Sequence, residues 1–202
     1  MVMYRGAARS ISLAVNSFKT FLLPEATARK GSRTVRLLLF NTTVTGTLYT
    51  FGDVIQQKVF GAGLPYDYAR TMRMCALGVC MGPLNHFWYL QLDRFIVGNS
   101  LTTVARKIVC DQLMFAPTCI TVFYLGMSLM EGKMWTASKM ELQNKFLPSY
   151  KADWAVWPAA QVINFCFVPG FLRVTYVNLV TLGWTTLLSY LKHKEHNSSL
   201  ST

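Results

Sequence analysis

The sequence predicts an all-α fold, a multi-pass bundle of about four to five transmembrane helices, and two observations carry that prediction. First, the stretch from Trp154 to Leu191 contains a single charged residue, Arg173. Second, 52% of the 202 residues are hydrophobic and only 14% are charged. A helix needs about 20 mostly apolar residues to cross a bilayer whose hydrocarbon core is about 30 Å thick. The chain is therefore expected to lie in a lipid bilayer.

Three further low-charge runs precede this stretch, and together with it they give the expected four to five helices. They are Leu37–Gly52, Met74–Leu92 and Gln112–Met130. The number of spans stays open because Pro158, Pro169 and Gly170 would break Trp154–Leu172 into a re-entrant piece. Such a break survives at membrane depth only where protein or water satisfies the freed backbone groups.

Residues 1–36 form a separate, strongly basic segment. They contain one acid, Glu25, and hold most of the net charge of +11. Up to Pro24, apolar residues recur at helical spacing and fall on one helix face, and basic and polar residues fall on another. An amphipathic start that is rich in Arg and poor in acids is typical of a mitochondrial targeting segment, and the alternative is a helix that lies on the membrane surface. Residues 37–192 are then expected to form the membrane domain, with a polar tail over 193–202.

The composition argues against several classes of function. The loops between the runs are nearly neutral, so no basic stripe indicates direct sequence-specific binding of nucleic acid. The five cysteines include no Cys-x-x-Cys pair and no Cys/His spacing of a zinc site. The sequence also contains no nucleophile motif, nucleotide loop or calcium loop. We therefore expect no metal, no cofactor and no enzymatic activity.

Polar side chains recur in the apolar runs, where they are costly and usually face another helix or water. Asp53, Gln56 and Gln57 share a helix face at the end of the first run. His86 and Asp93 share a face at the end of the second run. For each group two interpretations stay open, a pore lining or a hydrogen-bonded clamp between helices. The remaining candidates lie in the last stretch and are Gln161, Asn164 and Arg173.

Three other features bear on packing. Gly78 and Gly82 form a small-xxx-small pattern, which lets two helix backbones approach closely and suits a homo-oligomer. Asp111 and Gln112 open the third run. An acidic side chain is favourable at a helix N-terminus because of the helix dipole. Residues 133–153 form the most polar stretch between the runs, and we expect an interfacial helix or a docking surface for a soluble partner.

Short motifs in a fixed order resemble the Mpv-seventeen family, small multi-pass proteins of mitochondrial inner and peroxisomal membranes. The resemblance covers roughly residues 37–192. The motifs are Gly52-Asp53-x-x-x-Gln57, Gly82-Pro83-x-x-His86-x-Trp88-Tyr89-x-x-Leu92-Asp93, Asp111-Gln112, Trp154-x-x-Trp157-Pro158-x-x-Gln161-x-x-Asn164-Phe165-x-x-Val168-Pro169, and Arg173.

Four further segments are most similar to the Mpv-seventeen-like branch of that family. They are Tyr150–Trp154, Trp157–Gln161, Arg173–Tyr176 and Leu182–Trp184. This resemblance implies a mitochondrial inner-membrane protein that supports the assembly and stability of the mitochondrial ribosome, and so mitochondrial translation. Its implied partners are the lipid bilayer and the ribosomal large subunit. Other family members are described as weakly selective channels, so the alternative is a channel for small solutes or ions, with Asp53 and Asp93 setting a cation preference.

Overall fold

The computed structural model describes residues 30–61, 64–97, 100–168 and 173–200. The expected targeting segment up to residue 29, and the expected bend at Pro169 and Gly170, lie outside these residues. The helices are α2 (Lys30–Phe60), α3 (Tyr68–Phe95), α4 (Leu101–Cys110), α5 (Ala116–Met130), α6 (Trp135–Cys166) and α7 (Arg173–Leu200), and a π-helical turn, η1 (Asp111–Phe115), joins α4 to α5. No described residue lies in a strand, and the all-α prediction is confirmed.

The chain divides into two compact units, residues 1–41 and 42–202, with the boundary inside α2. In the first unit the described residues 30–41 form the first turns of α2. The second unit contains the rest of α2 and every later helix. All contacts described below lie within this second unit.

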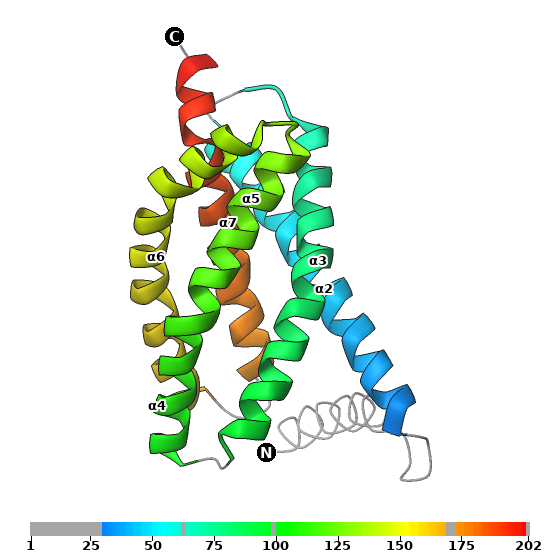
Figure 1. Ribbon diagram of the computed structural model, residues 1–202, viewed down its shortest axis with the longest axis vertical. Helices are drawn as coiled ribbons and strands as arrows, with labels where there is room; N and C mark the ends of the chain where they lie inside the picture. The colour runs from blue at the N-terminus through cyan, green and yellow to red at the C-terminus, as the bar shows by residue number, and fades with distance from the viewer. Residues whose placement is uncertain (1–29, 62–63, 98–99, 169–172, 201–202) are drawn as a thin grey trace, which may run out of the picture. The chain divides into compact units, whose positions relative to one another are not determined.

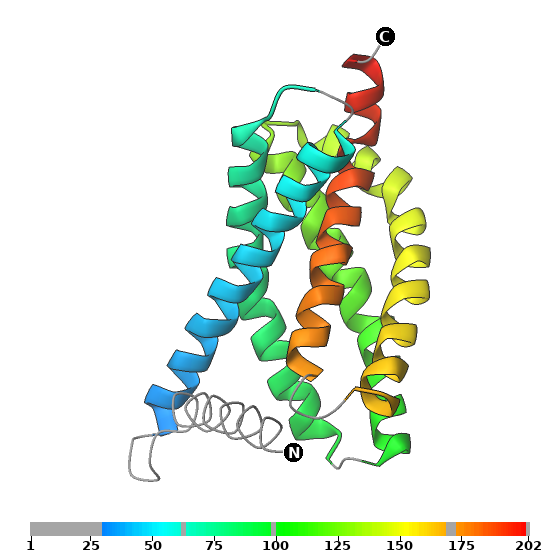
Figure 2. The same cartoon turned by 180° about the vertical axis from the view of Figure 1, so that it is seen from behind.

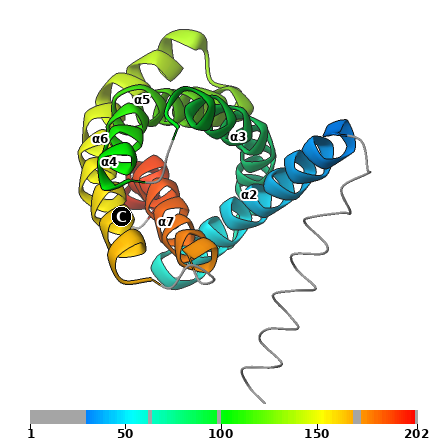
Figure 3. The ribbon, with the colours of Figure 1, turned by 90° about the horizontal axis from the view of Figure 1, so that it is seen from below.

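The helices of the second unit pack side by side around an apolar core (Figures 1 and 2). Seen from the end, α3, α5 and α6 are successive neighbours, and α7 lies between α6 and α2 (Figure 3). The hydroxyl of Thr185 on α7 donates a hydrogen bond to the carbonyl of Leu48 on α2 over 3.1 Å. The largest fully buried apolar side chains of the core are Met74, Met81, Ile120, Phe123, Tyr124 and Met127.

Small residues bring α2 close to α3 and α7. A Cβ atom on Gly78 would lie 2.8 Å from the Cβ of Tyr49, and a Cβ on Gly82 would overlap the backbone of Thr42. A Cβ atom on Gly52 would likewise overlap Thr185 on α7. The close approach expected of Gly78 and Gly82 is therefore made between α3 and α2 of one chain, and a homo-oligomer stays a prediction.

The path from Leu101 to Met130 corrects one prediction. Asp111 does not open a helix, because it lies in the middle of this path, in the π-helical turn. Pro117 accounts for the wider turn, since a proline ring clashes with the carbonyl four residues earlier and its nitrogen donates no hydrogen bond. The carboxylate of Asp111 accepts a hydrogen bond of 2.8 Å from Nε1 of Trp88 instead of from helix-terminal amides.

Residues 133–153 are helical from Trp135 onward, where they form the first part of α6, which continues through Pro148 and Pro158 without a break. The expected helix is therefore present, and its interfacial position and its docking role stay predictions. Packing against α5 offsets the backbone hydrogen bonds lost at the prolines. Next to Pro148, the hydroxyl of Ser149 lies 2.7 Å from that of Tyr124 on α5.

Beside its apolar core the bundle buries several polar side chains, and it exposes large apolar side chains; both are informative departures from a water-soluble bundle. The polar side chains of Asp53, Gln56, Gln112 and Ser128 are at most 1% exposed. Large apolar side chains are exposed along the helices of the bundle, among them Phe51, Val79, Leu129, Val162 and Leu179. Within the described residues, Leu101–Met130 is the one helical stretch that is long and apolar enough to cross a membrane by itself.

Candidate functional site

Asp53 is the centre of a buried polar group between α2, α3 and α7. Its Oδ1 accepts hydrogen bonds from Nε of Arg70, at 2.7 Å, and from the hydroxyl of Ser189, at 2.6 Å. Its Oδ2 accepts from the hydroxyl of Thr71 and from Nε2 of Gln57, both at 2.7 Å. The group, called here the Asp53 cluster, consists of Asp53, Gln56, Gln57, Arg70, Thr71 and Ser189.

The carboxylate of Asp53 is fully occupied. A carboxylate offers about four lone-pair sites, and Asp53 accepts four hydrogen bonds while its side chain is 0% exposed. Arg70 neutralises its charge and also donates through Nη2 to Ser189, at 2.8 Å, and to Oε1 of Gln56. This geometry is that of a clamp between three helices, because no oxygen of Asp53 is left to bind a passing ion.

The turn between α2 and α3 places Arg70 opposite Asp53. Asp67 caps α3, since its Oδ1 accepts a hydrogen bond of 2.9 Å from the backbone nitrogen of Arg70. Gln57 fixes the cap to α2, because its Oε1 accepts from the backbone nitrogen of Asp67 at 2.7 Å and its Nε2 donates to the carbonyl of Asp67 at 3.1 Å. Arg70 is thus held within the first turn of α3, where it reaches α2.

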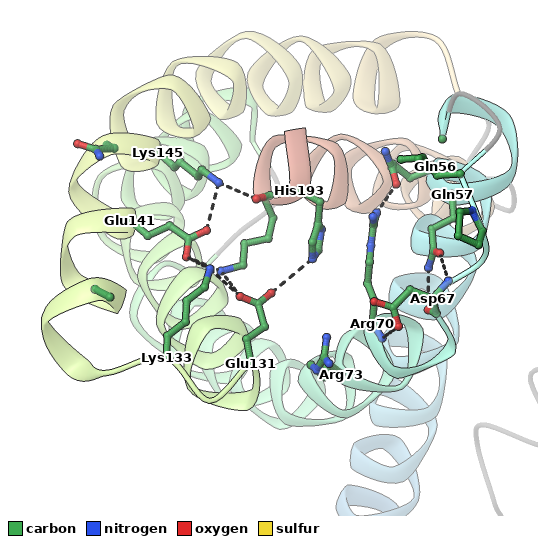
Figure 4. A pocket seen from close by; sticks show the side chains of 16 residues that line it. Gln56, Gln57, Asp67, Arg70, Arg73, Glu131, Lys133, Glu141, Lys145 and His193 are labelled. Carbon is green, nitrogen blue, oxygen red and sulfur yellow. Dashed lines mark hydrogen bonds and ion pairs between the residues drawn. The ribbon is translucent and has the colours of Figure 1, made fainter. Parts of the chain in front are cut away.

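A cavity of about 650 Å³ adjoins the Asp53 cluster (Figure 4). It lies between the end of α2, the start of α3, the loop after α5, the first part of α6 and the end of α7. We call it the charged cavity, because most of its polar lining is ionised. Its basic residues are Arg70, Arg73, Lys133, Lys145 and Lys192, and its acidic residues are Asp67, Glu131 and Glu141.

One side of the charged cavity is closed by a network of ion pairs. Nζ of Lys192, whose side chain is 1% exposed, lies 2.8 Å from Glu141 and 3.2 Å from Glu131. Nζ of Lys133 lies 2.7 Å from Glu141 and 2.9 Å from Glu131. Nζ of Lys145 lies 3.1 Å from Glu141. The network ties the end of α7 to α6 and to the loop after α5.

Burial and ion pairing act in opposite directions on the pKa values of this network. Burial alone would raise the pKa of Glu141, but hydrogen bonds from Lys133 and Lys192 outweigh it and lower that pKa to about 2. Burial would likewise raise the pKa of Glu131, which hydrogen bonds from His193 and Lys133 hold well below its usual range. Both carboxyls are therefore ionised at neutral pH.

The other polar residues singled out in the sequence do not join the Asp53 cluster. His86 is buried on α3, sixteen residues after Arg70, which is about 24 Å at 1.5 Å per residue. Asn164 is buried and Gln161 is half-buried near the far end of α6. Asp93 belongs to α3 and Arg173 begins α7, and the structure describes only the backbone of these two residues.

Several residues of the site are missed by sequence reasoning. Arg70 and Ser189 complete the Asp53 cluster, and Lys192 and Glu141 form the centre of the ion-pair network. A signal for Arg70 exists, because it is the first basic residue after Asp67, which caps the helix that follows Asp53. Glu141 gives no such signal, since its partner Lys192 is 51 residues away in the sequence.

Comparison with known proteins identifies the family. Residues 128–189 match the model of the Mpv17 / PMP22 family. Mpv17-like protein from Xenopus laevis is 35% identical over 161 residues, which cover 79% of this chain and 78% of that protein. Protein sym1 from Aspergillus oryzae is 40% identical over 158 residues, which cover 76% of this chain and 90% of that protein.

A third relative, of lower identity, matches the chain over a similar length. PXMP2/4 family protein 2 from Dictyostelium discoideum is 31% identical over 161 residues, which cover 76% of this chain and 83% of that protein. No solved structure matches the chain. Since the relatives are matched over most of their own length, the chain belongs to the Mpv17 / PMP22 family.

Proposed function

We propose that the protein is an integral protein of the mitochondrial inner membrane whose second unit crosses the bilayer four to five times. The observation that carries this proposal is the exposed apolar surface, with large side chains such as Val79 and Leu179 outside, together with the burial of the polar Asp53 and Gln56 between helices. Lipid tails solvate such an apolar surface at no cost. Membership of the Mpv17 / PMP22 family and the basic, acid-poor N-terminal segment support the mitochondrial location.

Alkaline extraction of mitochondria tests this placement. Sodium carbonate at high pH releases peripheral proteins and leaves integral ones in the membrane pellet. The protein should stay in the pellet and resist protease in mitochondria whose outer membrane has been opened, except at exposed loops. Release into the supernatant would refute the transmembrane placement.

Within that membrane, the protein's proposed role is to support the assembly and stability of the mitochondrial ribosome, and so mitochondrial translation. The resemblance of the C-terminal motifs to the Mpv-seventeen-like branch motivates this role. The saturated carboxylate of Asp53 supports it, since a tether needs a rigid anchor and no open pore. The first part of α6 offers exposed residues, among them Trp135, Lys139 and Met140, to a partner outside the membrane.

Affinity purification tests this role. The tagged protein is solubilised from mitochondria in mild detergent, and its sedimentation is compared with that of the ribosomal large subunit. Co-sedimentation that survives moderate salt is expected, and Lys139→Glu should weaken it while Arg94→Glu, an exposed charge on α3, should not. Sedimentation only as a small membrane complex would contradict the role.

A channel for small solutes or ions is the second candidate, and the charged cavity favours it. A cavity of about 650 Å³ that is open to one end of the bundle resembles the vestibule of a pore. Conductance of purified protein in planar bilayers tests the channel. If Asp53→Asn changes the ion selectivity and leaves the melting temperature unchanged, the channel replaces the anchor as the better account.

A further inference from the structure

The charged cavity has a surplus of basic groups. Five basic and three acidic side chains line it, and Asp53, which is paired with Arg70 behind the wall, adds a fourth acid. With His193 neutral, this set of groups keeps one net positive charge. A surplus charge in a semi-enclosed site attracts an anion, since the low-dielectric protein around the site focuses the electric field.

Arg73 carries this surplus. The lysines are engaged with Glu131 and Glu141, and Arg70 is engaged with Asp53. Within the described residues, no acid lies within ion-pair distance of Arg73 and no hydrogen bond occupies its guanidinium. Figure 4 shows Arg73 on α3 at the cavity, between Glu131 and Arg70. Its donors are therefore open to a ligand.

A second donor without a partner supports a ligand in this cavity. Gln56 lines the cavity and is 0% exposed, and its Nε2 makes no hydrogen bond within the described residues. The amide cannot be reversed to hide this donor, because its Oε1 accepts from Nη2 of Arg70. A buried donor without an acceptor costs about 1–3 kcal/mol, and an anionic oxygen in the cavity would relieve that cost.

We propose that the charged cavity binds a phosphate group, held mainly by the guanidinium of Arg73. Arginine recognises phosphate through paired hydrogen bonds. Arg73 and Gln56 bring donors to the cavity from different helices, α3 and α2. Donors on more than one side fit the four oxygens of a tetrahedral anion better than the two oxygens of a planar carboxylate. The volume is within the usual range for small-ligand sites.

The phosphate can belong to a soluble compound or to a phospholipid headgroup, because the cavity lies at one end of the bundle. The inference does not depend on the ribosomal role. It predicts a site for one phosphate group per chain, and it makes Arg73 the residue whose loss affects binding most.

Binding of inorganic phosphate to the full chain in detergent tests the site. Radiolabelled phosphate is measured by equilibrium dialysis at constant ionic strength for wild type, Arg73→Gln and Arg94→Gln. Arg94→Gln is the matched control, because it removes the same charge from the same helix outside the cavity. Since hydrogen bonds to a charged group contribute about 1.5–3 kcal/mol, Arg73→Gln should weaken binding roughly 10-fold or more, and Arg94→Gln should bind as wild type does.

A second arm separates the two sources of phosphate. The same three proteins are placed in nanodiscs of phosphatidylcholine with or without phosphatidic acid, and the retained phosphatidic acid is counted by native mass spectrometry. Saturable binding of inorganic phosphate that Arg73→Gln removes assigns the site to a soluble compound. Retention of phosphatidic acid that Arg73→Gln removes, without binding of inorganic phosphate, assigns it to a lipid. Equal behaviour of all three proteins, or no saturable binding of either probe, would overturn the proposal.

Discussion

Replacement of Asp53 by asparagine removes the charge at the centre of the Asp53 cluster and keeps the size of the side chain. The amide nitrogen of asparagine donates hydrogen bonds, and it would face donors of the cluster, which come from Arg70 and Ser189 on one side and from Thr71 and Gln57 on the other. Arg70, whose side chain is 7% exposed, would keep a buried charge without a counter-ion.

The expected loss follows from that burial. Removing one partner of a buried ion pair costs about 3–5 kcal/mol, because the other charge stays buried and uncompensated. Taking the lower end, about 3 kcal/mol, the melting temperature of a chain of this size should fall by roughly 6–12 °C. Thermal unfolding of the full chain in detergent, followed by circular dichroism, measures the change.

Asp67→Asn is the matched control. Asp67 is exposed and caps α3 through its side chain, and asparagine caps helices about as well as aspartate. This variant should melt within about 1–2 °C of wild type. Arg70→Gln should partly rescue Asp53→Asn, since the double variant leaves no buried charge. If Asp53→Asn melts as wild type does, the clamp interpretation of the Asp53 cluster is wrong.

Three further outcomes are expected from the contacts between helices. Gly82→Ala should cost about 1–3 kcal/mol of unfolding free energy, because its Cβ would overlap α2. Gly183→Ala, whose Cβ meets nothing within 4 Å, should be neutral or stabilising. Equal melting temperatures of the two variants would contradict the packing of α3 on α2. The pKa of Glu141 is lowered from 4.5 to about 2, so its contribution to stability is complete above pH 4.5 and is lost as the pH falls toward 2. The unfolding free energy should therefore fall less over that range in Glu141→Gln than in wild type. An unchanged pH profile would count against the ion-pair network. Trp88→Phe leaves the carboxyl of Asp111 without its indole donor and should lower the unfolding free energy by about 1–3 kcal/mol in chemical denaturation; no change would mean that another donor replaces the indole.

The positions of the helices could be predicted because a membrane helix leaves a signal in composition. Leu37–Gly52 lies within α2 and Met74–Leu92 lies within α3. An uncharged run of this length has few structures open to it other than a buried or lipid-facing helix. The ends of the helices were less accessible, because α2 continues past Asp53 to Phe60 once the polar residues of its last turns find partners on α3.

The role of a charged residue depends on partners that are distant in the sequence. Asp111 was placed at a helix start because its charge borders an apolar run, but Trp88 supplies the hydrogen bond that allows it to lie in the middle of a helical path. The pairing of Glu141, within residues 133–153, with Lys192 is likewise not visible in the local sequence pattern. Asp53, Gln56 and Gln57 were found because all three lie on one helix.

Labelling by a lipid-borne photoreactive group tests the central claim, that lipid surrounds the exposed apolar surface of the bundle and does not reach its core. The protein is reconstituted in phosphatidylcholine vesicles that contain a phospholipid with a carbene precursor in its acyl chain, and labelled residues are located by mass spectrometry. Labels should appear at exposed apolar positions such as Val79, Phe87 and Leu179, and not at Met74, Phe123 or Met127, which are 0% exposed. Labelling of the core set, or no labelling of the exposed set in a protein that still co-floats with the vesicles, would contradict the account.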